Sequence, residues 1–182
     1  MKFLTGNTVS LRALEPSDLQ FLFDVENEEA HWEISSTQTP YSKFLLKKYI
    51  ENTHQDIYEA KQLRLVIANK ENNDPIGLID LFDFNPTHKR AGIGLLVQQE
   101  HRQKGVASEA LELLISYAFH CLHLHQLYAN IMLENKISIA LFEAFKFECI
   151  GTKKDWIFSK RGYKDEALYQ LISKTKETCL KR

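Results

Sequence analysis

The spacing of hydrophobic residues predicts a chain that alternates between strands and helices. Short apolar or alternating runs predict strands at 8–14, 63–68, 76–84, 91–97, 126–133, 149–158 and 167–172. Apolar residues three and four positions apart predict helices after Pro16, over 41–60, over 105–122 and after Glu134. This order favours an α/β fold with a mixed, mostly antiparallel sheet, in which helix 105–122 joins one central parallel strand pair.

The turn between strand 91–97 and the following helix is the most informative stretch. It is polar, carries Arg102 and Lys104, and contains one glycine, Gly105. The first N–H groups of a helix have no intrahelical partner and lie at the positive end of the helix dipole, so the turn predicts an anion site. Its spacing, Arg-x-x-Gly-x-Ala ending at Ala107, is neither a Walker loop nor a dinucleotide fingerprint. An ordinary helix start is the alternative interpretation.

Length and composition add few constraints. The 182 residues, 44% of them hydrophobic and 26% charged, suit a single domain over 1–182, with a core from about 8 to 172 and a tail at 173–182. The net charge of −1 gives no basic footprint, so nucleic acid is not an expected partner. Neither a signal peptide nor a membrane-spanning run is evident, so we expect a cytoplasmic protein without a membrane partner.

The cysteines and histidines do not predict a metal site or a disulfide framework. The three cysteines are odd in number and lack a Cys-x-x-Cys pair. Three histidines cluster at the end of helix 105–122, but no cysteine or paired carboxylate stands at ligand spacing, and the helix dipole alone favours histidine there. These residues are Cys121, Cys149 and Cys179, and His120, His123 and His125.

Acidic residues gather between Asp24 and Glu33. Several carboxylates beside an aromatic ring are what a flexible organic cation would need, so this segment could form a cation-binding lip. A solvated helix end is the alternative. The candidate binding residues of the lip are Glu28, Glu29, Trp32 and Glu33.

The turn and the order of elements together resemble a known family. The motif ending at Ala107 is similar to the Gln/Arg-x-x-Gly-x-Gly/Ala signature of the GCN5-related N-acetyltransferases. Within that family the chain resembles bacterial spermidine and spermine N-acetyltransferases and ribosomal-protein alanine acetyltransferases. The resemblance covers about residues 8–172, and its matching segments are 9–15, 77–81, 88–91, 104–107 and 127–135.

The resemblance implies a fold, a cosubstrate and a set of binding residues. The central parallel strands would splay apart, with acetyl-CoA between them, no metal, and homo-oligomeric assembly. Backbone of the first parallel strand would bind the pantetheine arm and the glycine turn the diphosphate. The implied cofactor-binding residues are Leu95, Leu96, Val97, Arg102, Gln103, Lys104, Gly105, Val106, Ala107, Ser108 and Asn135. Capping of its own helix is an equal explanation for Asn135.

Three positions depart from the family pattern. Phe142 stands where the family usually has a tyrosine that protonates the CoA thiolate, and phenylalanine has no proton to give. Lys146 replaces a glycine, and Gly92 replaces a glutamate common in the polyamine enzymes. Because a thiolate whose thiol has a pKa near 8.5 can take its proton from water, the loss of the tyrosine need not abolish activity, and the sequence leaves open whether the enzyme is slow or inactive.

The expected reaction is direct attack of a primary amine on acetyl-CoA, with a polyamine such as spermidine or spermine as acceptor. An alkyl ammonium with a pKa of about 10.4 must first lose a proton. Asp80 is our first candidate base and Glu33 the second. Asp80 and Asp83 are also candidate substrate-binding residues; because they are three apart in a strand, we expect them on opposite faces.

Two other functions remain open. The acceptor could be a protein N-terminal amine, as in the ribosomal-protein relatives. The chain could also be a catalytically weak CoA-binding module, because Phe142 replaces the tyrosine acid.

Overall fold

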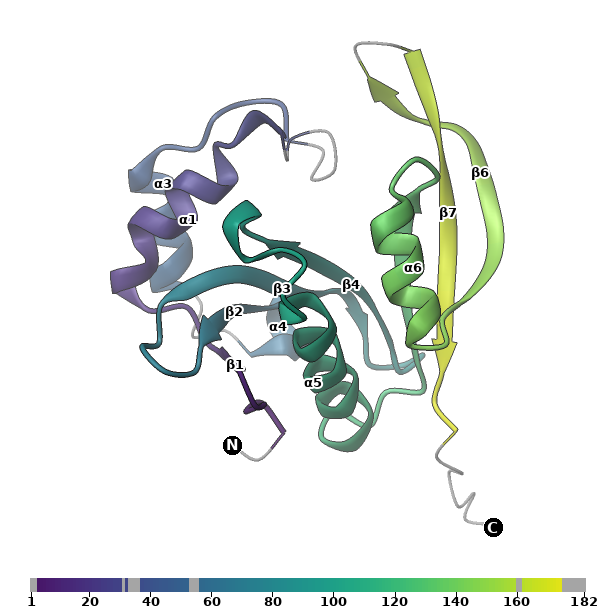
Figure 1. The fold of residues 1–182 in the computed structure, drawn as a ribbon, viewed down its shortest axis with the longest axis horizontal. Coiled ribbons are helices and arrows are strands. Elements are labelled where there is room, and N and C mark those ends of the chain that lie inside the picture. The colour runs from purple at the N-terminus through teal and green to yellow at the C-terminus, as the bar shows by residue number, and fades with distance from the viewer. Residues whose placement is uncertain (1–2, 31, 33–36, 53–55, 160–161, 175–182) are drawn as a thin grey trace.

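The chain forms one seven-stranded sheet with the strand order β1-β2-β3-β4-β5-β7-β6. The computed structural model describes residues 3–30, 32, 37–52, 56–159 and 162–174. All neighbouring strands are antiparallel except β4 and β5, which confirms the predicted fold class (Figure 1). The strands are β1 Val9–Arg12, β2 Leu63–Asn69, β3 Pro75–Asn85, β4 Arg90–Val97, β5 Gln126–Met132, β6 Glu148–Ser159 and β7 Gly162–Ile172.

Five helices of the described chain flank this sheet. They are α1 Leu19–Glu26, α3 Lys43–Glu51, α4 Ile57–Ala60, α5 Val106–His120 and α6 Lys136–Ala144, and short 3-10 turns cover Pro16–Asp18 and Gln99–His101. None of the helices in the described ranges is long and apolar enough to cross a membrane.

The single helix predicted over 41–60 is wrong, because the structure has two shorter helices there. The Ser42 hydroxyl accepts the Leu45 N–H and starts α3, which ends at Glu51. Asp56 then caps a new helix by accepting the N–H groups of Tyr58 and Glu59. The apolar spacing continues across both helices, so it conceals the break that the capping side chains create.

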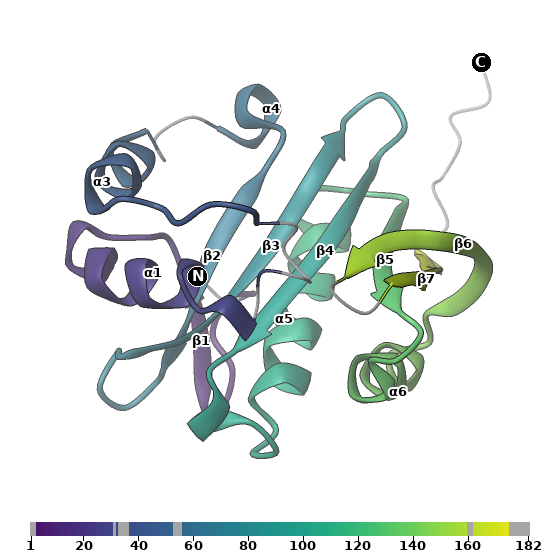
Figure 2. The same cartoon turned by 90° about the horizontal axis from the view of Figure 1, so that it is seen from above.

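The sheet separates two hydrophobic cores. Strand residues of one parity, such as Leu65, Ile79 and Leu127, pack with α5 in the larger core. Residues of the other parity, such as Val66 and Leu78, pack under α1 and α3. Figure 2 shows α1 and α3 on one side of the sheet and α5 on the other. Helices α1 and α3 cover the β1–β3 half of their side, so the β4–β5 part of that side is left for a site.

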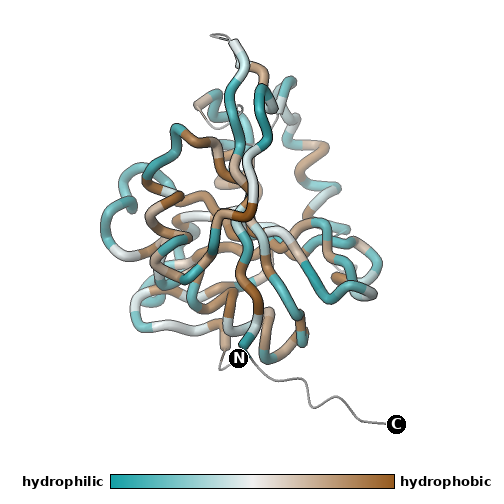
Figure 3. The backbone as a smooth tube through the Cα atoms, turned by 90° about the vertical axis from the view of Figure 1, so that its right-hand side faces the viewer, coloured by the Kyte–Doolittle hydropathy of each residue, from teal (hydrophilic) through white to brown (hydrophobic). Residues whose placement is uncertain are grey.

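The β6–β7 hairpin extends beyond the rest of the chain (Figure 3). Strand β7 begins five residues before the strand predicted from 167, because its pairing with β6 continues to Ser159↔Gly162. Near the end of the hairpin the rings of Phe158 and Tyr163 pack edge to face while remaining 73% and 64% exposed.

Candidate functional site

Strands β4 and β5 pair over only three positions before they separate. The pairs are Arg90↔Gln126, Ala91↔Leu127 and Gly92↔Tyr128. On its other edge β4 stays paired with β3 as far as Gly77↔Val97. Beyond Gly92, β4 therefore has a strand neighbour on one side only, and the predicted backbone positions Leu95, Leu96 and Val97 lie along this open edge.

The glycine turn presents a row of backbone N–H groups. Gln103 and Gly105 have positive φ angles of 60° and 81°, and the first helical hydrogen bond runs from Glu109 N to Gly105 O. The N–H groups of residues 103–108 have no hydrogen-bond partner among the described residues. A Cβ at Gly105 would meet no atom within 4 Å, so the approach to these amides is open. Unpaired amides at a helix start can bind an anion.

The side chains of two predicted cofactor-binding residues form hydrogen bonds within the protein. The Arg102 Nε donates to the Val97 carbonyl at 2.9 Å, so this side chain ties the turn to the end of β4. Asn135 accepts the Ser138 N–H at 3.1 Å and thereby caps α6, as the alternative interpretation of this residue expected.

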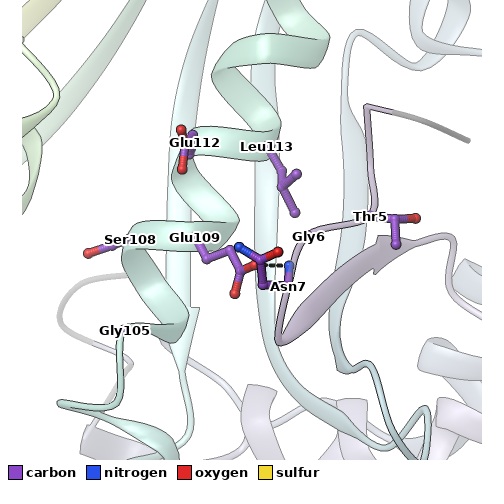
Figure 4. Close-up of a pocket in the computed structure, with 8 residues that line it drawn as sticks. All are labelled: Thr5, Gly6, Asn7, Gly105, Ser108, Glu109, Glu112 and Leu113. Atoms are coloured by element: carbon purple, nitrogen blue, oxygen red, sulfur yellow. Dashed lines mark hydrogen bonds between the residues drawn. The ribbon is translucent and has the colours of Figure 1, made fainter.

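A pocket of about 510 Å³ lies between the start of α5 and the N-terminal loop (Figure 4). It shares Gly105 and Ser108 with the turn, but Glu109 and Glu112 also line it, and these carboxylates do not suit a diphosphate. Glu109 binds the loop instead, by accepting the Thr8 hydroxyl and the N–H groups of Asn7 and Thr8. Burial alone would raise the pKa of Glu109, but these hydrogen bonds hold it below its usual value.

The departures at Phe142 and Lys146 belong to one helix terminus. Lys146 has a φ of 67°, the left-handed conformation that glycine adopts without strain. Lys146 N donates to Glu143 O and Phe147 N donates to Phe142 O, which completes a Schellman motif. The left-handed backbone at position 146 therefore explains why the family pattern has a glycine there. Phe142 is 4% exposed and packs edge to face on Phe147.

The departure at Gly92 is explained by a neighbouring aromatic ring. Gly92 is paired with Phe82 on β3, and a Cβ at Gly92 would lie 2.3 Å from the Phe82 ring. The same ring packs edge to face on Tyr128 of β5. Phe82 thus occupies the space that a larger side chain at position 92 would need.

Asp80 is held in an ion-pair network. Arg64 of β2 donates from Nε and from Nη2 to the two Asp80 oxygens at 2.8 and 3.2 Å, and from Nη1 to Glu26 of α1 at 2.6 Å. Burial alone would lower the pKa of Arg64, but the charges of Asp80 and Glu26 raise it above its usual value. A carboxylate bound on both oxygens by a permanent cation is a poor proton acceptor, so this arrangement disfavours our first candidate base.

The expectation that Asp80 and Asp83 alternate strictly between faces is wrong. The β3–β4 register shifts between Phe82 and Asn85, and Asp83 has a φ of 48°. Leu81 and Phe84 both lie in the larger core although they are three apart, which shows that one extra residue interrupts the alternation. Asp83 is exposed and accepts a hydrogen bond from the Tyr128 hydroxyl at 3.1 Å.

The acidic lip is only partly described. Glu28 and Glu29 are exposed just after α1, and the Trp32 Nε1 donates to the Glu26 carbonyl at 2.9 Å. Glu33 lies outside the described residues, so the structure places neither this candidate base nor its side chain.

Two residues of this region were absent from the sequence-based prediction. Arg64 is a charged residue in an apolar strand, the same signal that drew attention to Asp80. Tyr128 gave no signal, since tyrosine is common in strands and its position at the separation of β4 and β5 depends on register.

Comparisons with known proteins agree with this geometry. The model of the acetyltransferase (GNAT) domain family matches residues 8–148. Spermidine N(1)-acetyltransferase of Vibrio cholerae serotype O1 is 29% identical over 173 residues, which cover 93% of this chain and 96% of that protein.

Two solved structures of spermidine N-acetyltransferase from Vibrio cholerae are similar. The complex with CoA and spermine has a TM-score of 0.83 and 24% identity, and covers 92% of this chain and 96% of the other. A dodecameric structure has a TM-score of 0.77 and 27% identity, and covers 92% and 95%.

Proposed function

Because the chain belongs to the acetyltransferase (GNAT) domain family, we propose that it transfers the acetyl group of acetyl-CoA to a primary amine of a polyamine such as spermidine or spermine. The proposal rests on the separation of β4 from β5 after Gly92↔Tyr128 and on the turn beyond the end of β4, where the amides of residues 103–108 have no partner within the described ranges. An extended acyl-pantetheine could bind along the open strand edge, and the diphosphate attached to it could accept hydrogen bonds from the row of amides.

The cofactor-binding residues are proposed on this geometry. The backbone of Leu95 and Leu96 would bind the pantetheine arm, and the amides of the turn would bind the diphosphate, with Lys104 adding charge at its rim. Since the Val97 carbonyl already accepts Arg102, Val97 would contribute its N–H or its apolar side chain instead. Asn135 would contribute to cofactor binding indirectly, by fixing the position of α6, because its side-chain oxygen caps that helix.

The acceptor would enter from the side of the sheet that carries Asp80, Asp83 and Tyr128. This side is bordered by the end of α1, where Glu28, Glu29 and Trp32 lie. Carboxylates along this entry suit a molecule with several ammonium groups, because each cation gains charge pairing without deep burial. A single acetyl transfer would remove one positive charge from such a molecule.

The assembly is also a proposal. A dodecameric structure exists for the similar Vibrio cholerae enzyme. The exposed rings of Phe158 and Tyr163 at the end of the hairpin, joined by Trp156 at 59% exposure, give this chain apolar surface that a second copy could cover. We propose a homo-oligomer, which light scattering on the purified protein would test.

The experiment that tests the function is an acceptor panel. The protein is incubated with acetyl-CoA and spermidine, spermine, a peptide with a free N-terminus or a simple monoamine, and acetylated products are measured by mass spectrometry. Mass detection is preferable to a thiol reagent because Cys121 and Cys149 are exposed thiols. We expect turnover with the polyamines. Turnover with the peptide alone would instead support a protein acetyltransferase, and CoA binding without any product would support a binding module.

A further inference from the structure

Tyr128 and Asp83 meet at the point where the central strands separate. Gly92↔Tyr128 is the last pair between β4 and β5, and the Tyr128 ring packs at 83° against Phe82, with centroids 5.7 Å apart. From this position the Tyr128 hydroxyl donates to Asp83 Oδ2 at 3.1 Å. A carboxylate of β3 is thereby fixed at the start of the gap.

The backbone at Asp83 is unusual for a strand. Its φ of 48° lies in the left-handed region, and the residue is the extra one in the β3 bulge. Non-glycine residues in this conformation are uncommon, and bulges next to active sites serve to re-aim a side chain. Here the bulge directs Asp83 away from the core, since Leu81 and Phe84 on either side both pack into it.

Asp83 differs from the other carboxylates on its side of the sheet in having a neutral partner. Asp80 and Glu26 share Arg64, and Glu166 of β7 binds Lys153 at 2.7 Å. Within the described ranges Asp83 makes no ion pair, and its hydrogen bond comes from a phenol. Burial and the charge of Asp83 raise the pKa of Tyr128 to about 12, while the nearby Arg90 opposes that shift, so the phenol keeps its proton at neutral pH.

We propose that Asp83 is the catalytic residue that binds the reacting ammonium group and accepts its proton, and that Tyr128 is a positioning residue that orients this carboxylate. The proposal rests on the function proposed above and assigns the base that the bidentate contact with Arg64 disfavours at Asp80. This chain has glycine at position 92, where a glutamate is common in the polyamine enzymes that it resembles. The proposal explains how Asp83 can supply the missing carboxylate where β4 and β5 separate.

The reaction balances with this assignment. The alkyl ammonium gives one proton to the Asp83 carboxylate, and the freed nitrogen lone pair forms a bond to the thioester carbonyl carbon. The C–S bond then breaks and the CoA thiolate leaves with its electron pair. The second nitrogen proton is lost as the amide forms, water carries a proton to the thiolate, and Asp83 returns its proton to water. One proton is released overall, together with the N-acetyl amine and CoA.

The test compares Asp83→Asn and Tyr128→Phe with the wild-type chain, using acetyl-CoA and spermidine. Asp83→Asn keeps an acceptor for Tyr128 but removes the base, so we expect kcat/KM to fall about 10² to 10⁴-fold. CoA affinity, measured by calorimetry, should stay within about twofold, because the diphosphate amides are on another element. Asp74→Asn, on the exposed β2–β3 turn, is the matched control.

Tyr128→Phe distinguishes positioning from a purely structural role. Loss of the donor removes the hydrogen bond that orients the Asp83 carboxylate, so the carboxylate would be held less often in the position that accepts the proton. The accompanying fall in kcat should be about three- to tenfold, with KM changed less. Tyr163→Phe, which removes a hydroxyl at the exposed end of the hairpin, should leave both kcat and KM unchanged.

The outcomes separate this proposal from the proposed function. Wild-type kcat/KM in Asp83→Asn would overturn the assignment while leaving the acetyltransferase function standing. A wild-type chain that binds CoA but acetylates no amine would overturn both. Thermal unfolding of each variant shows whether a loss reflects misfolding, and if Asp83→Asn is unfolded, a wild-type kcat in folded Tyr128→Phe overturns the proposal.

Discussion

The rings of Phe142 and Phe147 meet edge to face, with centroids 5.0 Å apart and planes at 83°, across the Schellman motif that ends α6. This apolar contact between the third-last helical residue and the second residue beyond the cap is a usual companion of that motif. It fixes the ring at the position where the family pattern predicts a proton donor, so one hydroxyl can be added there without moving the helix.

Phe142→Tyr should therefore raise kcat. The new hydroxyl would lie at the family's acid position and could protonate the thiolate, and general acids contribute about 10² to 10⁴-fold in favourable cases. We expect a gain of at least about tenfold in single-turnover acetylation of spermidine. Phe145→Tyr, on the same helix terminus, serves as a control that adds a hydroxyl elsewhere. An unchanged rate in a folded Phe142→Tyr variant would show that the thiolate does not depend on an acid here.

Lys146→Gly should stabilise the fold. A non-glycine residue in the left-handed conformation costs about 1–2 kcal/mol, part of which is offset by the greater freedom of glycine in the unfolded chain. We expect a net gain of about 0.5–1 kcal/mol in urea unfolding. Lys146→Ala keeps the strain while removing the charge, so it should change stability by less than the glycine variant.

Gly105→Ala should weaken CoA binding more than it weakens the fold. A Cβ at Gly105 meets nothing within 4 Å, so the free protein would suffer only the backbone strain of φ 81°, about 1–2 kcal/mol. In the complex that Cβ would occupy the approach to the amides, and affinity measured by calorimetry should fall about tenfold or more, which is about 1.4 kcal/mol.

Gly162→Ala provides the comparison for that variant. Gly162 also has a positive φ, of 116°, with open space around it, but it begins β7 at the end of the hairpin. It should show a similar loss of stability with unchanged CoA affinity. Equal CoA affinity in both variants would count against diphosphate binding at the turn.

Stability should fall in acid partly because of Asp18. Its side chain is 3% exposed and accepts both Arg12 Nη groups, at 2.7 and 2.9 Å, and the Glu15 N–H. Burial alone would raise the pKa of Asp18, but these partners hold it below its usual value. A lowered folded-state pKa stabilises above the unfolded value of about 3.9, and this stability is lost as pH falls through the folded pKa.

Asp18→Asn isolates that contribution. It should lower the free energy of unfolding by about 3 kcal/mol at pH 7, because Arg12 loses its charged partner at a part-buried site. The difference from wild type should shrink as urea unfolding is repeated from pH 5 towards pH 2. A difference that stays constant over this range would show that the ionised carboxylate is not the cause.

The fold and the row of open backbone amides at the glycine turn could be predicted from the sequence, because both depend on local patterns. Strand alternation, the period of α5 and one glycine at a helix start are readable along the chain. The break between α3 and α4 was missed because apolar spacing outweighed the capping signal at Asp56. The surroundings of Asp80 and Asp83 could not be predicted in this way. Asp80 lies opposite Arg64 and Asp83 lies in a bulge, and neither the strand register nor the bulge can be deduced from the sequence of one strand.

Phe82 also constrains how this chain could change over evolutionary time. A glutamate introduced at position 92 would collide with its ring, whereas trimming the ring first would remove its edge-to-face contact with Tyr128. The two substitutions are therefore epistatic, each harmful in the background lacking the other. Two lineages that differ at positions 82 and 92 could therefore interconvert by single substitutions only through a less fit intermediate, whichever amine they acetylate.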